Sequence, residues 1–166
     1  MFKDKIIQNL KIALKEKREI EVSVLRMLLA AILNKEKEKR YRLNKEKPDL
    51  GQEELEKEYQ LTEEEITSIV SIEAKKRKEA IMAFEKGERK DLAEKEKKEL
   101  DILKKYLPEQ LSEEELYQTI KQAIAETGAK EIKDMGKVMK ELMPRIVGRA
   151  HGNQVSDIVK ELLKND

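Results

Sequence analysis

The chain has 166 residues, a formal net charge of +1, 43% charged and 39% hydrophobic residues, and no cysteine. The lack of cysteine excludes disulfides, thiol nucleophiles and cysteine-bound metal centres, and the single histidine excludes a multi-histidine metal site within one chain. The near-neutral charge leaves binding to nucleic acid or membrane to a local patch. Aromatic residues make up only 4%, which favours long amphipathic helices over a sheet.

Apolar residues at helical spacing predict a first helix over residues 2–17 and a second over residues 19–44. Toward the end of the second helix the apolar stripe gives way to charges, so this end is predicted to project into water. Pro48 and Gly51 predict a turn, after which the chain returns as another helix. Residues 35–65 are therefore expected to form a charged helical hairpin.

Capping boxes predict where the next two helices begin. Thr62 and Glu65 have the spacing that satisfies the first backbone N–H groups of a helix, which then runs to a C-cap at Gly87. Asp91 and Glu94 repeat this spacing and predict a second capping box.

A proline-containing junction predicts a domain boundary. Pro108 is expected to end the preceding helix, and Ser112 with Glu115 forms a third predicted capping box directly after it. The predicted fold is all-α, with an N-terminal multi-helix domain over residues 1–107 and a C-terminal part of three short helices over residues 108–166.

Within the C-terminal part, Gly128 is predicted to end the first helix and residues 130–143 to form the second. Pro144 is predicted to open the connection to the last helix, which has Asn153 as its expected N-cap. No apolar run reaches the length of a membrane helix, and the N-terminus lacks the features of a secretory signal, so we expect a cytoplasmic protein. The Lys- and Glu-rich composition without cysteine indicates a thermophilic source.

Basic residues of the C-terminal part form the candidate binding site. Lys133, Lys137 and Lys140 recur along one side of the predicted 130–143 helix, and Arg145 with Arg149 extends the series into the connection. Such a stripe is able to follow a phosphate backbone. The alternative is a solvated helix face, because acidic residues lie in the same helix. Residues alone leave both interpretations open.

The segment MPRIVGRAHGNQ gathers the only histidine of the chain, His151, between Gly148 and Gly152. His151 could act as a general base only with an orienting partner and a substrate pocket, and Asp157 lies on a separate element. No nucleophile, glycine-rich phosphate loop or metal-binding loop is evident. We therefore expect no catalytic residue, no metal and no cofactor, and interpret the two glycines as structural turns.

Three stretches together resemble the YqeY-like family: VLRMLLAAILNKE, KKRKEAIMAFEKGERKDLAEKEKKELDILKKYLPEQLS and KDMGKVMKELMPRIVGRAHGNQVSDIVKELL. They occur in the family's order and cover nearly the whole chain. Residues 41–61 depart from it, because the hairpin is longer than in the shortest family members. The family is similar to the C-terminal tail domain of the B subunit of the tRNA-dependent amidotransferase, which uses glutamine to convert misacylated Glu-tRNA or Asp-tRNA to the amide form.

The resemblance implies a two-part all-helical protein, in which an N-terminal helical domain precedes a C-terminal three-helix bundle. It also implies a tRNA partner. In the amidotransferase, the region similar to KDMGKVM…GRAHG is implicated in gripping the tRNA elbow, and similar domains appended to some glutaminyl-tRNA synthetases aid tRNA binding. The residues implied to contact tRNA here are Lys133, Lys137, Lys140, Arg145, Arg149 and His151. The amidotransferase active sites lie in other domains, so carbon–nitrogen ligase activity with glutamine as the amide donor is implied by kinship only.

Three function classes follow from the sequence. The first is a non-catalytic tRNA-binding accessory module. The second is a protein-interaction module whose charged hairpin docks on a translation enzyme, such as an aminoacyl-tRNA synthetase or an amidotransferase. The third is an enzyme of carbon–nitrogen ligation. Salt-dependent affinity for tRNA distinguishes the first class from the others.

Overall fold

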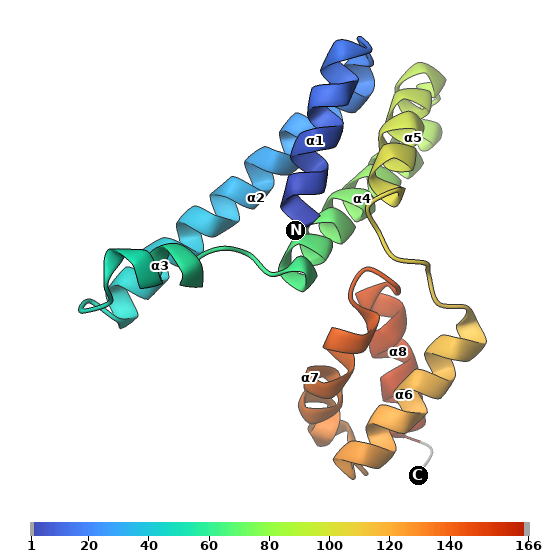
Figure 1. Cartoon of the computed structure of the whole chain (residues 1–166). Coiled ribbons are helices and arrows are strands. Elements are labelled where there is room, and N and C mark those ends of the chain that lie inside the picture. Colours follow the sequence, from blue (N-terminus) through green and yellow to red (C-terminus); the bar gives the residue numbers. More distant parts are fainter. Residues whose placement is uncertain (1, 165–166) are drawn as a thin grey trace. The chain divides into compact units, whose positions relative to one another are not determined.

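The computed structural model describes residues 2–164, and these residues contain eight α-helices, one short 3-10 helix and no strand (Figure 1). The predicted all-α class is therefore confirmed. The described residues divide into two compact units, with the division between Tyr106 and Leu107. In chain order the helices are α1 (Phe2–Lys15), α2 (Glu19–Glu46), α3 (Gln52–Glu58), α4 (Glu63–Lys86), α5 (Lys90–Lys104), α6 (Glu113–Thr127), η1 (Ile132–Asp134), α7 (Met135–Ile146) and α8 (Gly152–Leu162).

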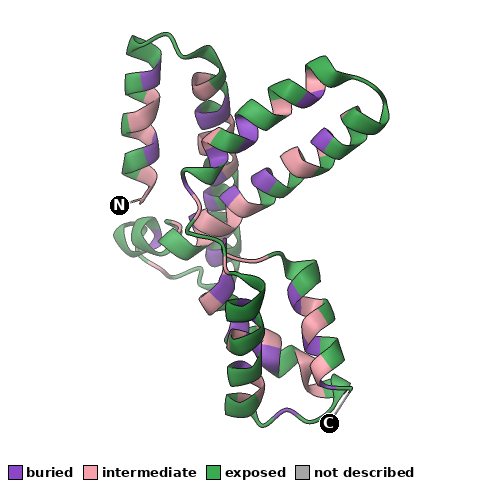
Figure 2. Ribbon diagram, turned by 90° about the vertical axis from the view of Figure 1, so that its right-hand side faces the viewer, coloured by how far each residue is buried: buried purple, intermediate pink, exposed green. Residues whose placement is uncertain are grey.

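The first unit is held together by the apolar faces of α1, α2, α4 and α5, and α3 packs on the end of α2. Buried residues recur at helical intervals along these helices, and exposed residues lie on the opposite sides (Figure 2). Tyr106, just after α5, is buried, and its hydroxyl accepts a hydrogen bond from Asn9 Nδ2 at 2.7 Å. This bond ties the end of the unit to its first helix.

The second half of α2 differs from the prediction, because charged residues there make tertiary contacts. Glu36 is only 4% exposed, and both of its carboxylate oxygens accept hydrogen bonds from Lys3 Nζ, at 2.8 and 2.7 Å. Further along the helix, Lys39 Nζ lies 2.9 Å from Glu65 Oε2. A buried carboxylate needs a partner, and Lys3 supplies one for Glu36. Charged residues on the second half of α2 therefore contact other helices, whereas the apolar pattern predicted that this part of the helix projects into water.

Two of the three predicted capping boxes are present. In each box the hydroxyl of Thr62 or Ser112 accepts the N–H of the third helical residue, and the glutamate there accepts the N–H of the cap residue. The box predicted at Asp91 is wrong. Helix α5 begins two residues earlier than this box predicts, at Lys90 with Arg89 at the N-cap. Asp91 therefore lies in the first turn, where Arg89 pairs with it.

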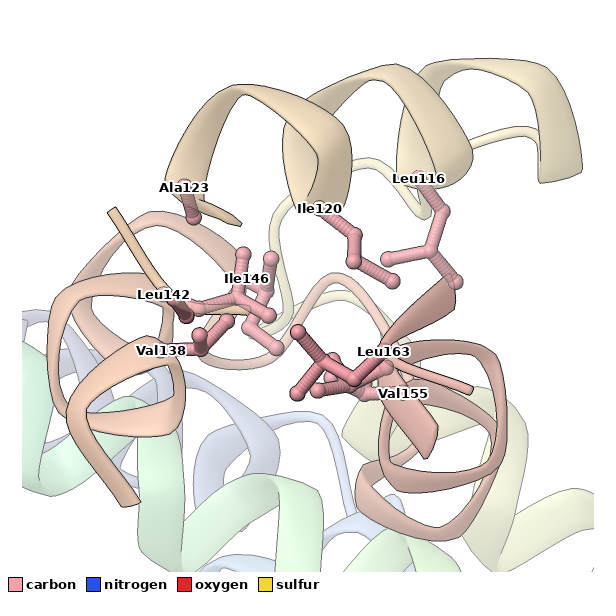
Figure 3. Close-up of a cluster of buried hydrophobic side chains, with 10 residues drawn as sticks. Leu116, Ile120, Ala123, Val138, Leu142, Ile146, Val155 and Leu163 are labelled. Atoms are coloured by element: carbon pink, nitrogen blue, oxygen red, sulfur yellow. The ribbon is translucent and has the colours of Figure 1, made fainter. Parts of the chain in front are cut away.

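The second unit is a three-helix bundle with its own core (Figure 3). Helix α6 ends as predicted at Gly128, which adopts a left-handed conformation with φ +62°. The side chains of α6, α7 and α8 converge on one apolar cluster, as their spacing predicted. Its buried members are Leu116, Ile120, Ala123, Ala129, Val138, Leu142, Ile146, Val155, Val159 and Leu163.

Three predicted boundaries in this unit are wrong. The helix expected from residue 130 begins at Met135, because Glu131 and Asp134 form a capping box around the η1 turn. Pro144 lies within the last turn of α7 rather than after it, since the helix continues until Ile146 is buried in the core. Helix α8 starts at Gly152, so the N-cap is His151 and not Asn153.

Ion pairs between helices bear on the expected heat stability. Pairs such as Lys39–Glu65, Lys97–Glu85 and Arg77–Glu99 join different helices. The cost of desolvating such charges falls as temperature rises. We expect a melting midpoint above the mesophile range of about 45–65 °C, measured by circular dichroism. A midpoint within that range contradicts a thermophilic source.

The Thr62 capping box is expected to make stability depend on pH. Burial raises the pKa of Glu65, but the Thr62 backbone N–H and the Lys39 ammonium outweigh it, so the pKa lies below its ordinary value of 4.5. A lowered pKa adds stability above the ordinary value, and this stability is lost as pH falls through the folded-state pKa. Glu65→Gln keeps an acceptor for Thr62 but no charge.

We therefore expect the Glu65→Gln variant to be less stable than the parent at pH 7, and the difference to shrink in acid. Urea unfolding midpoints of both proteins at neutral and acidic pH measure this effect. Glu64→Gln is the matched control, because Glu64 is exposed in the same helical turn and is expected to show less pH dependence. An equal difference between Glu65→Gln and the parent at both pH values contradicts the prediction.

Candidate nucleic-acid interface

The loop between α7 and α8 forms a corner fixed by hydrogen bonds. Gly148 has φ +73°, a left-handed conformation that glycine adopts without strain. The carbonyl of Gly148 accepts a hydrogen bond from Gln110 Nε2 at 2.6 Å, and that of Arg149 accepts one from the Leu111 backbone N–H at 2.9 Å. The Arg149 Nε donates to the Glu109 carbonyl at 3.1 Å. The corner is thus tied to residues 109–111, which precede α6.

The corner ends at the N-terminus of α8. His151 is exposed and occupies the N-cap position, but its side chain does not cap the helix. The first turn of α8 has no acidic residue, and Gly152 leaves open space where a side chain would stand. Backbone N–H groups at a helix N-terminus favour an anion. This end of the corner is therefore electrostatically compatible with phosphate.

The three predicted lysines are exposed along η1 and α7. Lys133 lies in the η1 turn, where its Nζ is 2.9 Å from Glu131 Oε2. Lys137 Nζ lies 3.3 Å from Asp134 Oδ1, and the N–H of Lys130 followed by the Lys137 ammonium lowers the pKa of Asp134. Lys140 makes no ion pair with any residue from 2 to 164. The local carboxylates partly neutralise the stripe, but all three ammonium groups stay at the surface.

Gly136 lies on the same helix as Lys137 and Lys140 and was not predicted from the sequence as a site residue. It lies in the first turn of α7, is exposed, and a Cβ built there meets nothing within 4 Å. Glycine destabilises a helix by about 1 kcal/mol relative to alanine. Neither backbone conformation nor packing within the described chain requires it. A glycine within the predicted helix, in the segment KDMGKVM, was the sequence signal that could have identified it.

Gly136 lies among the lysines, since Lys133 is three residues before it and Lys140 four residues after it. Two large apolar side chains on the same stretch are also exposed, Ile132 at 47% and Met143 at 43%. We call this surface, made of Ile132, Lys133, Gly136, Lys137, Lys140 and Met143, the α7 face. It combines positive charge with bare helix backbone, which lets a ligand approach closely.

Arg145 does not add a free charge to the α7 face. Its guanidinium pairs with Glu126 of α6 and with Glu141 of α7, and these two carboxylates, Glu126 first, raise its pKa. Arg145 therefore bridges two helices. The structure brings Arg149 and His151 together in the corner, and Lys133, Lys137 and Lys140 along the α7 face.

The pairing of Arg145 leads to a prediction about binding. We expect Arg145→Ala to weaken binding of a polyanion less than Lys140→Ala, although both variants remove one positive charge. The reason is that Arg145 already neutralises two carboxylates, whereas Lys140 has no ion-pair partner among the described residues. Polyanion affinity of the two variants, measured in parallel at low salt, tests this ranking. A larger loss for Arg145→Ala than for Lys140→Ala contradicts it.

The charge balance of the second unit shows that the positive charge of the α7 face is local. Residues 107–166 contain more acidic than basic side chains.

Among the residues that the structure describes, no group of three or more His, Cys, Asp or Glu side chains could hold a metal ion. Within the same residues, no helix is long and apolar enough to cross a membrane.

This helical architecture agrees with the comparison to known families. A family model described as "Yqey-like protein" matches residues 47–163, and the chain therefore belongs to the YqeY-like family. The match begins within residues 41–61, the segment that departs from the family, so VLRMLLAAILNKE lies outside the matched range. The α7 face and the corner lie inside it.

One curated relative is similar over a shorter range. "Uncharacterized protein C22F3.15" of Schizosaccharomyces pombe is 43% identical over 51 residues, which make up 31% of this chain and 42% of that protein. The match thus spans less than half of that relative's length.

Proposed function

We propose that this protein is a non-catalytic tRNA-binding accessory module, and that the α7 face is where it contacts RNA. The observation that carries the proposal is the exposed Gly136 among Lys133, Lys137 and Lys140. Lysine ammonium groups neutralise backbone phosphates and release counterions, and a glycine removes the side chain that would hold a sugar–phosphate chain away from the helix.

The corner supports the same proposal from the neighbouring segment. Arg149 and His151 flank the N-terminus of α8, where backbone N–H groups favour an anion. Because Arg149 donates to the Glu109 carbonyl through Nε, the rest of its guanidinium has donors for a phosphate. Phosphate contacts position an RNA without reading its sequence. The choice of tRNA as the RNA rests on family kinship.

The test is binding of bulk tRNA by the full chain across a salt series, measured by gel shift or fluorescence anisotropy. We expect affinity that falls steeply and linearly with salt on logarithmic axes. A double-stranded DNA of similar length serves as the comparison polyanion. No tRNA affinity at low salt contradicts the proposal, and equal affinity for the DNA contradicts tRNA as the preferred partner.

A second candidate function uses the first unit. Tyr41 is 75% exposed on the second half of α2, within the charged hairpin that a Lys47–Glu58 ion pair closes at 2.7 Å. Exposed tyrosines are common anchors of protein interfaces. We propose docking of this hairpin on a translation enzyme as the alternative, tested by co-purification and by its loss in Tyr41→Ala. Carbon–nitrogen ligation rests on kinship alone and is not proposed.

A further inference from the structure

The outer surface shared by α6 and α8 contains two adjacent hollows that the proposed RNA contact does not use. One hollow is lined by Tyr117, Lys121, Lys130 and Leu162, among others. The other is lined by Tyr117, Asp157, Ile158 and Glu161, among others. Tyr117 belongs to both hollows and is 37% exposed, so it lies at the centre of one continuous surface. We call this surface the α6–α8 face.

The α6–α8 face has an apolar centre and oppositely charged ends. Ile158 and Leu162 lie one helical turn apart on α8 and are only partly covered by the core beneath. On one side of Tyr117 the exposed charges are Lys121 and Lys130. On the other side they are Glu113, Asp157 and Glu161. No ion pair within residues 2–164 joins the two ends. The charges are therefore available to a partner.

This charge arrangement restricts the partner. A partner of one sign would be attracted to one end and repelled by the other, and like charges brought together at an interface oppose binding. A partner must carry the same arrangement in the opposite direction. A second copy of this face, turned by a two-fold axis, carries it. A two-fold axis at right angles to the line joining the two ends places each basic end against an acidic end, in an isologous contact.

We propose that the α6–α8 face is a homodimer interface with its two-fold axis near Tyr117. In this arrangement the two Tyr117 rings lie at the centre of the contact, where aromatic residues contribute most to binding. Lys121 Nζ already lies 4.9 Å from the Tyr117 ring centroid in its own chain, which shows that the ring accepts a cation. The proposal does not rest on RNA binding, since the α7 face uses other residues.

The experiment uses two complementary full-length double variants. Lys121→Glu with Lys130→Glu makes both ends acidic, and Asp157→Lys with Glu161→Lys makes the acidic end net basic although Glu113 remains. Each variant alone should repel its own copy and weaken dimerisation by at least about tenfold. An equimolar mixture pairs an acidic face with a basic face and should restore dimers as heterodimers. Sedimentation equilibrium measures all three samples and the parent, and circular dichroism checks that helicity is retained.

The matched control reverses charges on the other unit, with Lys105→Glu and Glu64→Lys, at two exposed positions. Dimerisation of this control should equal that of the parent. A parent that stays monomeric up to about 1 mM overturns the proposal. A dimer that persists unchanged in both double variants, or a mixture that does not recover association, overturns the placement of the interface. The tRNA affinity of the monomeric variants is a separate readout, so failure here is distinguishable from failure of the RNA-binding proposal.

Discussion

Replacing Leu142 with alanine is expected to unfold the three-helix bundle while residues 2–106 remain folded. Leu142 has no exposed surface and lies within the cluster that α6, α7 and α8 share. Leu→Ala at such a site costs about 2–5 kcal/mol, from reduced burial and the cavity left behind. A unit of about 60 residues has a stability of roughly 3–9 kcal/mol in total. One substitution therefore removes much or all of its stability.

Hydrogen exchange followed by mass spectrometry measures this effect segment by segment. We expect peptides of α6, α7 and α8 to lose protection in the Leu142→Ala variant, and peptides of α1, α2, α4 and α5 to keep it. Met143→Ala is the matched control, because Met143 is the next residue in α7 and is 43% exposed. It should change stability by no more than about 0.5 kcal/mol. Simultaneous loss of protection throughout the chain would show one cooperative core and contradict independent units.

Replacing Lys133, Lys137 and Lys140 together with alanine is expected to lower tRNA affinity by about a hundredfold or more at 0.1 M salt. The salt slope should flatten by roughly three units, about one for each phosphate that the variant no longer neutralises. The reduction should be similar for different tRNAs, because backbone contacts do not read sequence. The fold should be retained, since none of these side chains belongs to the buried cluster.

The control for this variant removes the same charge elsewhere. Lys35, Lys37 and Lys45 are exposed on α2, and their triple alanine variant should keep most of the affinity and the parental slope. A more local test is Gly136→Glu, which places a bulky anion in the α7 face without a clash within the chain. If the Lys133/Lys137/Lys140 variant binds as the parent does with an unchanged slope, the α7 face is not where tRNA binds.

Local signals were sufficient to predict much of this fold. The capping boxes at Thr62 and Ser112 and the C-cap at Gly128 depend on residues only a few positions apart, and the structure contains all three. Apolar spacing predicted the three C-terminal helices, and the family resemblance implied that they form a bundle. Asp91 has the same local pattern as Thr62 with its glutamate, but Arg89 pairs with it and the helix begins earlier. The start of α5 therefore depends on Arg89 as well as on the local pattern at Asp91.

Long-range contacts explain what the sequence did not predict. Lys3 pairs with the buried Glu36, which lies 33 positions away in the sequence, and Glu126 pairs with Arg145 across 19 positions. Neither partner is identifiable from spacing within one helix. Pro144 is tolerated inside α7 because burial of Ile146 favours a further turn. At the candidate site, the lysines were found by periodicity. The helical position of Gly136 was visible in the sequence, but only the structure shows that open space surrounds it.

The ties between residues 109–111 and the corner have a consequence for biosynthesis. The Glu109 carbonyl meets the Arg149 side chain across 40 positions of sequence, and the Gln110 amide meets the Gly148 carbonyl across 38. On a ribosome, the first partner of each pair emerges well before the second, while the preceding unit is already complete. Since domains fold in order of synthesis, we expect residues 109–111 to lack these hydrogen bonds until the corner has been translated. Closure of the bundle also waits for α8, because Val155, Val159 and Leu163 complete its core.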